Sequence, residues 1–428
     1  MVLMNQRKFL GLTTIEQIFR ICLQLLTTFL ISRLVAPEAF GWSAITSMLI
    51  SGVTALTQIS TEPLIISSDN LDNQTLNKIW SLGLILNLLA GSGLSLLAIF
   101  AFHDSNPRIV LIGSASSLIA WSYGAVSRAL INKENGFKRL MQIGILSSFA
   151  NLLSSFSLAS VFHSGTFALV GGQFFAILVS TVLVLKSVSH SNHFMIPKML
   201  DSALFNFFRN NILSTLSNFA ARNTDTMMII LSLGILQLAF YDRAYALVYS
   251  AQIALSQTYS RVLLPKYSRS NTRINEIYFA DLRNYAMVSV VMNSPFFLFP
   301  LFITRVLYGR HYESTAKLLP YLAIAGVLQS FSSLSGTVLL ALRRADQQLR
   351  LAGISFVIYV ASFVYVRIDH PSLLRFALAN IFAAGMMVLV TTTFLNKREI
   401  GLQTLKHVES LLFPAAILFL FWMYLPRY

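Results

Sequence analysis

Ionisable side chains inside otherwise apolar stretches are the residues of this chain best placed to do chemistry. In the first such stretch Glu16 and Arg20 are one helical turn apart, so a helix would let them pair. On the same helix Gln24 shares their face, and the opposite face is apolar. This stripe predicts either the wall of a wet cavity or an ion pair that only locks helix packing.

A second polar face occurs in the apolar stretch Leu204–Leu233. Because eight strongly polar groups cannot all face lipid, we expect this face to line a wet lumen. Arg209 and Asp225 could instead lie near opposite interfaces and extend to water. The eight residues are Asn206, Arg209, Asn210, Ser214, Ser217, Asn218, Arg222 and Asp225.

The balance of the ionisable residues within the spans favours an anionic ligand, although we expect Arg128, Asp242, Arg243 and Arg375, which are near span ends, to be interfacial rather than central. Six basic residues stand against four acidic ones, and guanidinium groups bind phosphate through paired donors. We expect Glu16 to position Arg20, although Glu16 and Asp225 could also bind a coupling proton or sodium ion. The basic set is Arg20, Arg128, Arg209, Arg222, Arg243 and Arg375, and the acidic set is Glu16, Glu62, Asp225 and Asp242.

Motifs for other chemistry are missing from the sequence. There is no glycine-rich phosphate loop ending in Lys-Ser/Thr, which argues against a built-in ATPase. The seven histidines are scattered and the single cysteine lies in the first stretch, so we expect no metal site and no cofactor. No nucleophile–base arrangement stands out, so we do not expect an enzyme.

The elements that must position the polar residues are membrane-spanning helices. The chain is 55% apolar and 11% charged, and a bilayer core needs roughly 20 apolar residues per helix. We predict an all-α polytopic membrane protein with thirteen spans. They are Gly11–Val35, Phe40–Leu64, Ile79–Phe102, Ile109–Ile131, Leu140–Phe162, Thr166–Val188, Leu204–Leu233, Leu238–Leu264, Tyr285–Leu307, Leu318–Leu342, Leu349–Val366, Leu373–Leu395 and Leu411–Leu425.

The net charge of +15 is explained by topology rather than by nucleic acid, which we do not expect as a partner. With the N-terminus inside, the inner joints hold 19 basic residues and the outer joints hold 7. Positive residues favour the cytoplasmic side, so we predict a plasma-membrane protein with a cytoplasmic N-terminus.

Short sequence matches indicate an internal duplication. The segment Gly124–Leu130 ends the fourth span, and the similar Gly336–Leu342 ends the tenth. An even offset of six spans implies two six-helix lobes related by a pseudo-twofold axis along the membrane normal. The predicted parts are lobe 1–188, cytoplasmic linker 189–201, lobe 202–396 and an appended thirteenth helix in 397–428.

Three motifs give the chain a family resemblance. The turn Ser32–Gly41 precedes the second span, Asn223–Ile230 leads to Phe240–Tyr245, and Val306–Arg310 joins the ninth and tenth spans. In this order they resemble the polysaccharide and O-antigen repeat-unit flippases of the multidrug/oligosaccharidyl-lipid/polysaccharide exporter superfamily. Val35-Ala36 replaces the leucine-glycine that is usual in the first motif.

The resemblance implies alternating access and export of an undecaprenyl-pyrophosphate-linked glycan across a bacterial inner membrane. Arg20, Arg209 and Arg222 would then meet the anionic headgroup, and Gln24, Asn210 and Asn218 would line the polar path of the sugars. Polysaccharide polymerase and glycosyltransferases would be partners. Two alternatives stay open: a cation-coupled drug exporter of the same superfamily, and a non-transporting scaffold of a glycan-assembly complex.

Overall fold

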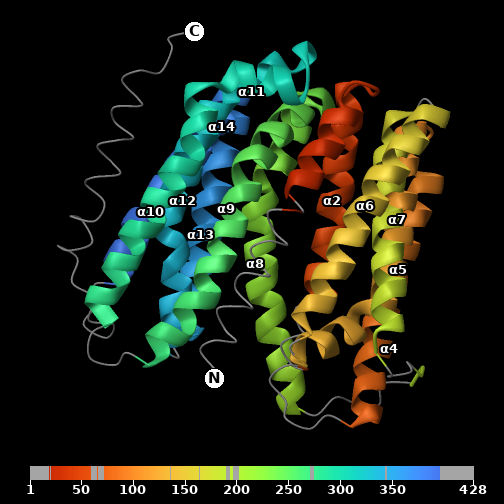
Figure 1. Ribbon diagram of the computed structural model, residues 1–428, viewed down its shortest axis with the longest axis horizontal. Coiled ribbons are helices and arrows are strands. Elements are labelled where there is room, and N and C mark those ends of the chain that lie inside the picture. The colour runs from red at the N-terminus through yellow and green to blue at the C-terminus, as the bar shows by residue number, and fades with distance from the viewer. Residues whose placement is uncertain are drawn as a thin grey trace. The chain divides into compact units, whose positions relative to one another are not determined.

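The chain folds as a set of long helices (Figure 1). The computed structural model describes residues 19, 21–58, 65, 72–134, 136–162, 164–188, 193–195, 202–269, 274–342 and 345–395. Within these ranges nearly every residue is helical and no strand occurs, which confirms the predicted all-α class.

Two compact units make up the chain, residues 1–223 and 224–428. Their boundary falls inside one helix, α8, between Asn223 and Thr224. The division predicted from the sequence, with a linker at 189–201, stays a prediction. In the described part of that linker, His193 N and Met195 N donate to Asn77 Oδ1 and Ser81 Oγ of the first unit.

The first unit is built around the contact of α5 with α7. In addition, α6 packs on α7, α4 packs on α5, and α2 lies against both α5 and α7. The helices are 21–31, α2 (Pro37–Gln58), α4 (Asn73–Phe100), α5 (Ser105–Lys133), α6 (Phe137–Phe162) and α7 (Gly165–Lys186), followed by the start of α8 (Ser202–Leu233).

Small and polar residues set the local geometry of the first unit. Asp72 caps α4 by accepting a bond from Thr75 N at 3.1 Å, which satisfies one free N–H of the first turn. A Cβ atom on Gly172 would lie 1.7 Å from Ser155 Oγ, so only glycine allows α6 and α7 to approach this closely.

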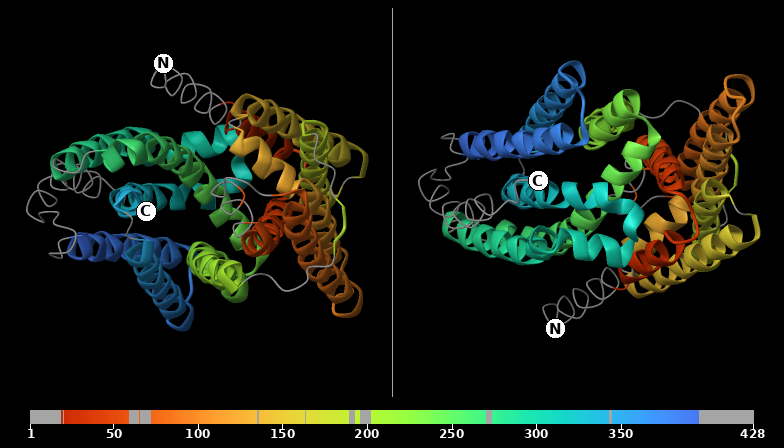
Figure 2. Two further views of the ribbon diagram at one scale, coloured as in Figure 1. Left: turned by 90° about the horizontal axis from the view of Figure 1, so that it is seen from below. Right: turned by 90° about the horizontal axis from the view of Figure 1, so that it is seen from above.

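In the second unit, α12 is the central helix. It packs against α9, α10, α11, α13 and α14, and 67% of its most apolar stretch is buried. Figure 2 shows these helices from both ends. They are α9 (Ile235–Arg269), α10 (Ile274–Leu298), α11 (Pro300–Leu307), the short 3₁₀ helix η1 (Arg310–Tyr312), α12 (Glu313–Ala341), α13 (Ala345–Ile368) and α14 (Leu373–Leu395).

The predicted ninth span is broken into two helices. Pro295 lies inside α10, and the break comes at Phe299, after which Pro300 occupies the first turn of α11. The two helices are bent by 79°. Pro300 favours this break because proline suits the first helical turn, where no backbone donor is needed.

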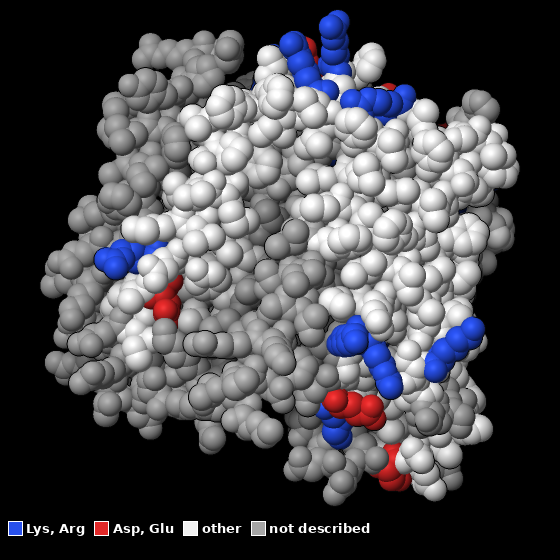
Figure 3. Space-filling view, in the orientation of Figure 1, with Lys and Arg blue, Asp and Glu red and all other residues white. Residues whose placement is uncertain are grey.

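Seven helices of the described residues are long and apolar enough to cross a membrane, or eight if the bent pair counts as one span. The polytopic class is therefore confirmed. On the face shown in Figure 3, most of the described charged side chains lie toward the top and bottom, one blue and red pair lies at mid-height on the left, and the described surface between them is uncharged. The predicted thirteenth span and the start of the first lie outside the described residues.

Candidate functional site

A buried polar network in the second unit centres on Asp225. Its side chain is 4% exposed, and Tyr241 Oη donates to Asp225 Oδ2 at 3.0 Å. Thr226 N donates to Asp225 Oδ1 at 2.7 Å. Asn380 Nδ2 donates to Tyr241 Oη at 3.2 Å. The network joins α8, α9 and α14.

A column of tyrosines on α9 extends this network. Tyr241, Tyr245 and Tyr249 are spaced by four residues, so they lie on one face of the helix. The rings of Tyr245 and Tyr249 stack with centroids 4.0 Å apart. Tyr249 Oη donates to Asn380 Oδ1 at 3.2 Å, so Asn380 bonds to both ends of the column.

Further along α9, a second polar cluster lies against α10. Gln252 Nε2 donates to Tyr285 Oη at 3.2 Å, and Ser289 Oγ donates to Gln252 Oε1 at 2.9 Å. Asn293 Nδ2 donates to the Ser289 carbonyl at 2.8 Å. All four side chains are buried. The face of α9 that enters the core is therefore polar over several turns.

Asp225 pairs with none of the arginine side chains that the structure describes. Its hydrogen-bond partners are Thr226 and Tyr241. The side chain of Arg222, three residues earlier on α8, is exposed. The interpretation that Asp225 extends to water at an interface is wrong, because Tyr241 and Thr226 enclose its carboxylate.

The other residues predicted for the site are described only in part. The side chain of Gln24 is exposed, beside buried Leu23. Arg209, Asn210 and Asn218 lie on α8, but their side chains are outside the described set. Glu16 and Arg20 are outside the described residues altogether.

Two of the sequence motifs meet in the second unit. The Tyr308 hydroxyl donates to the Arg243 carbonyl at 3.3 Å, and Thr315 Oγ1 donates to the Phe240 carbonyl at 3.1 Å. The rings of Phe240 and Tyr312 meet edge to face with centroids 5.8 Å apart. The start of α9 is thus held by the joint between α11 and α12.

The ion pair at the start of α9 is internal to that motif. Arg243 Nε donates to Asp242 Oδ2 at 3.1 Å, and Arg243 Nη2 also pairs with the same oxygen. Both side chains are largely buried. In the described part of the chain no cluster of three or more His, Cys, Asp or Glu side chains could hold a metal ion.

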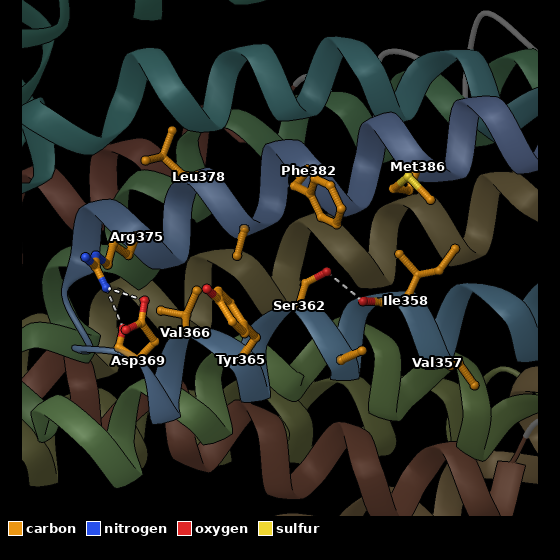
Figure 4. Close-up of a pocket in the computed structure, with 12 residues that line it drawn as sticks. Val357, Ile358, Ser362, Tyr365, Val366, Asp369, Arg375, Leu378, Phe382 and Met386 are labelled. Carbon is orange, nitrogen blue, oxygen red and sulfur yellow. Dashed lines mark hydrogen bonds and ion pairs between the residues drawn. The ribbon is translucent and has the colours of Figure 1, made fainter.

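A groove of about 670 Å³ lies between α13 and α14 (Figure 4). Apolar side chains such as Val357, Phe382 and Met386 line most of it. One end is polar, because Arg375 Nη1 donates to Asp369 Oδ2 at 3.0 Å. With so few polar groups, this groove suits a hydrocarbon chain rather than a sugar.

Sequence reasoning missed Tyr241, Tyr249 and Asn380. The spacing of tyrosines by four along α9 is a signal that one face is specialised. Asn380 is also visible as an amide within the apolar stretch Leu373–Leu395, where a polar group needs a partner. Their contact could not be foreseen, because 139 residues separate Tyr241 from Asn380.

Comparison with protein families gives a match over most of the chain. The model of a family described as polysaccharide biosynthesis protein matches residues 30–317. The matched segment contains all three sequence motifs. A search of curated protein sequences returns no match.

Solved structures with a similar fold include a lipid II flippase and transporters of the MOP superfamily. The lipid II flippase MurJ in an inward closed conformation matches with a TM-score of 0.78 at 15% identity, covering 97% of this chain and 93% of that one. An inward-facing multidrug resistance MATE transporter of the MOP superfamily matches with a TM-score of 0.67 at 14% identity, covering 89% and 99%. A MOP superfamily transporter from Pyrococcus furiosus with reverse polarity of its binding pocket matches with a TM-score of 0.61 at 14% identity, covering 91% and 96%. The chain therefore has the MOP superfamily fold.

Proposed function

The chain belongs to the polysaccharide biosynthesis protein family, and we propose that it flips a lipid-pyrophosphate-linked oligosaccharide from the cytoplasmic to the outer leaflet. Its fold is that of membrane transporters, which supports movement of a substrate rather than its chemical conversion. The proposed mechanism is alternating access, in a membrane where the N-terminus is cytoplasmic.

The observation that carries the proposal is that α8 has one buried face and one exposed face. Ala221, Asp225 and Ile229 are buried at successive turns, which fixes one face of the helix in the protein. Arg222 lies off this face and is exposed. An exposed guanidinium on a long helix of a membrane protein is costly in lipid, so it supports a wet pathway at this point.

Arginine suits the proposed cargo. A pyrophosphate offers pairs of charged oxygens that the planar guanidinium can bind through two parallel hydrogen bonds. We assign this role to Arg222, together with Arg20 and Arg209. Gln24, Asn210 and Asn218 supply amide groups that can exchange hydrogen bonds with sugar hydroxyls as these lose water.

Asp225 takes the coupling role in this proposal. Its hydrogen-bond partners are the hydroxyls of Thr226 and Tyr241 and the backbone N–H of Thr226, and none of these groups carries a positive charge. A buried carboxylate without a counter-charge is stable only when a proton or cation neutralises it. Binding and release of that ion would therefore change the packing of α8 on α9 and α14, and Glu16 would serve to position Arg20.

The test is a flipping assay on purified protein in liposomes, with a fluorescent polyprenyl-pyrophosphate oligosaccharide as cargo. Arg222→Ala should reduce the rate at least tenfold, since a bidentate charged contact contributes about 1.5–3 kcal/mol. Arg222→Lys should restore only part of the rate, because the ammonium lacks the planar fork.

Arg367→Ala is the matched control, since Arg367 is an exposed arginine at the end of α13. It should flip the cargo at the wild-type rate. Wild-type protein that fails to move the oligosaccharide but moves a cationic drug would overturn the proposal in favour of a drug exporter. Unchanged flipping in Arg222→Ala would remove the arginine from the mechanism.

A further inference from the structure

A polar pocket lies inside the first unit, and none of its lining residues is among those assigned to transport. Its volume is about 390 Å³, and α5, α6 and α7 line it. It forms because α5 and α6 both pack closely on α7 but touch one another little. The gap between α5 and α6 therefore becomes a cavity with α7 as its floor.

The charge of this pocket comes from Arg128. Its guanidinium carbon lies 3.5 Å from the centroid of the Trp121 ring, and Arg128 Nη2 donates to Ser180 Oγ at 3.0 Å. These two contacts fix the plane of the guanidinium. Among the described residues that line the pocket, none is acidic.

Neutral polar groups stand on the α6 wall of the pocket. Ser147, Ser148 and Asn151 are lining residues. The hydroxyls of Ser147 and Ser148 donate to the Gly144 carbonyl, which leaves their lone pairs as acceptors. Ile143 and Ile177 add apolar surface next to them. The pocket thus combines a fixed cation with hydroxyls and a short hydrocarbon wall.

The depth of Arg128 in the bilayer follows from its position on α5. It lies five residues before Lys133, the last residue of the helix, which is about 7.5 Å along the axis. Lys133, Lys138 and Arg139 form the basic joint that the charge distribution places on the cytoplasmic side. Only 11% of the most apolar stretch of α6 is buried, so the pocket has an exposed helix at its edge.

We propose that this pocket binds the phosphate group of a lipid with net negative charge from the inner leaflet, with Arg128 as its anchor. Basic pockets between helices on the cytoplasmic side are suited to anionic lipid headgroups. Ile143 and Ile177 would contact the start of its chain. The proposal does not depend on glycan flipping, because it concerns a different part of the first unit.

The phosphate could come from a membrane phospholipid or from a polyprenyl phosphate, and the experiment separates these sources. Native mass spectrometry of the full-length protein in detergent would count bound lipids during titration with phosphatidylglycerol, with phosphatidylcholine or with undecaprenyl phosphate. Arg128→Gln should weaken binding of the anionic lipid about tenfold, and binding of phosphatidylcholine should not change.

Two further variants keep the test independent of folding. Ser147→Leu fills the pocket while leaving Arg128 in place, and it should weaken binding of the same lipid. Arg139→Gln removes a charge from the same end of the unit, where Arg139 Nη1 donates to the Ser187 carbonyl at 3.2 Å outside the pocket. Its lipid binding should match that of the wild type.

Each outcome of this experiment either supports the proposal or overturns it. Loss of phosphatidylglycerol binding in Arg128→Gln and Ser147→Leu supports the proposal, with a membrane phospholipid as the occupant of the pocket. Loss of undecaprenyl phosphate binding alone supports the proposal, with the carrier lipid as the occupant of the pocket. Equal lipid binding in the wild type and in both pocket variants overturns the proposal, and so does equal weakening in Arg139→Gln, which would reveal only general charge attraction.

Discussion

Asp225 imposes the strongest constraint at the scale of single residues, because its carboxylate is 4% exposed and has only neutral partners. If it exchanges the coupling ion, Asp225→Asn should abolish the response of flipping to an ion gradient, since an amide binds neither a proton nor a cation strongly. The measurement is the flipping rate in liposomes with an imposed gradient, before and after an ionophore collapses it.

Asp369→Asn is the matched control for this prediction. Asp369 pairs with Arg375 at the end of the groove between α13 and α14, and both side chains are partly exposed. Its replacement should leave the gradient response intact, because a surface ion pair contributes little. A gradient response that persists in Asp225→Asn would give the residue a purely structural role.

Tyr241 supports the same network through its hydroxyl, which donates to Asp225 and accepts from Asn380. Tyr241→Phe keeps the ring but leaves two buried polar groups without this partner, and it should cost about 1–3 kcal/mol of stability. Thermal unfolding in detergent would show a lower Tm. Tyr365→Phe should leave the Tm unchanged, because Tyr365 is 67% exposed.

At the scale of elements, the joint between α11 and α12 depends on one glycine. Gly309 has φ 90° and ψ −178°, a backbone region that is essentially closed to other residues. Gly309→Ala should therefore destabilise the second unit by about 1–3 kcal/mol and weaken the bond from Tyr308 to the start of α9.

Gly385→Ala tests whether this effect comes from the backbone conformation. Gly385 lies within α14, and a Cβ there would meet no atom within 4 Å. Alanine should leave stability unchanged or raise it by up to about 1 kcal/mol, since glycine is unfavourable inside a helix. A similar loss of Tm in both variants would contradict the role given to Gly309.

Elements were more predictable from the sequence than the contacts between them. Apolar length alone located α4 to α7 and α12 to α14, because a membrane helix leaves a strong local signal. Pro295 and Pro300 both lie in the predicted ninth span, and the helix breaks only beside Pro300. The choice depends on the packing of α11 against α12, which leaves no signal in the local sequence.

The candidate site shows the same limit. Asp225 and Arg222 could be identified as polar residues on one helix, but sequence could not tell that one is buried and the other exposed. Burial depends on which face of α8 meets Tyr241, a residue of the next helix, and on Asn380 from the last described one. Such long-range contacts leave no periodic signal in the chain.

For the whole molecule, orientation in the membrane is the property that every proposal here shares. The count of 19 basic residues in inner joints against 7 in outer joints predicts a cytoplasmic N-terminus and a cytoplasmic 189–201 linker. Single cysteines at Ser191 and Ser105 would report the two sides, after the native and exposed Cys22 is replaced by serine. Ser105 begins α5 and is itself exposed.

A membrane-impermeant maleimide added to intact cells should label the Ser105→Cys variant and spare the Ser191→Cys variant. Both should react once the membrane is permeabilised, which controls for access. In the predicted orientation α5 starts outside and ends near Lys133 inside. Arg128 then lies at the depth of inner-leaflet phosphates. Labelling of Ser191→Cys in intact cells would show that the orientation in the membrane is the opposite one. The lipid bound by the pocket would then have to come from the outer leaflet.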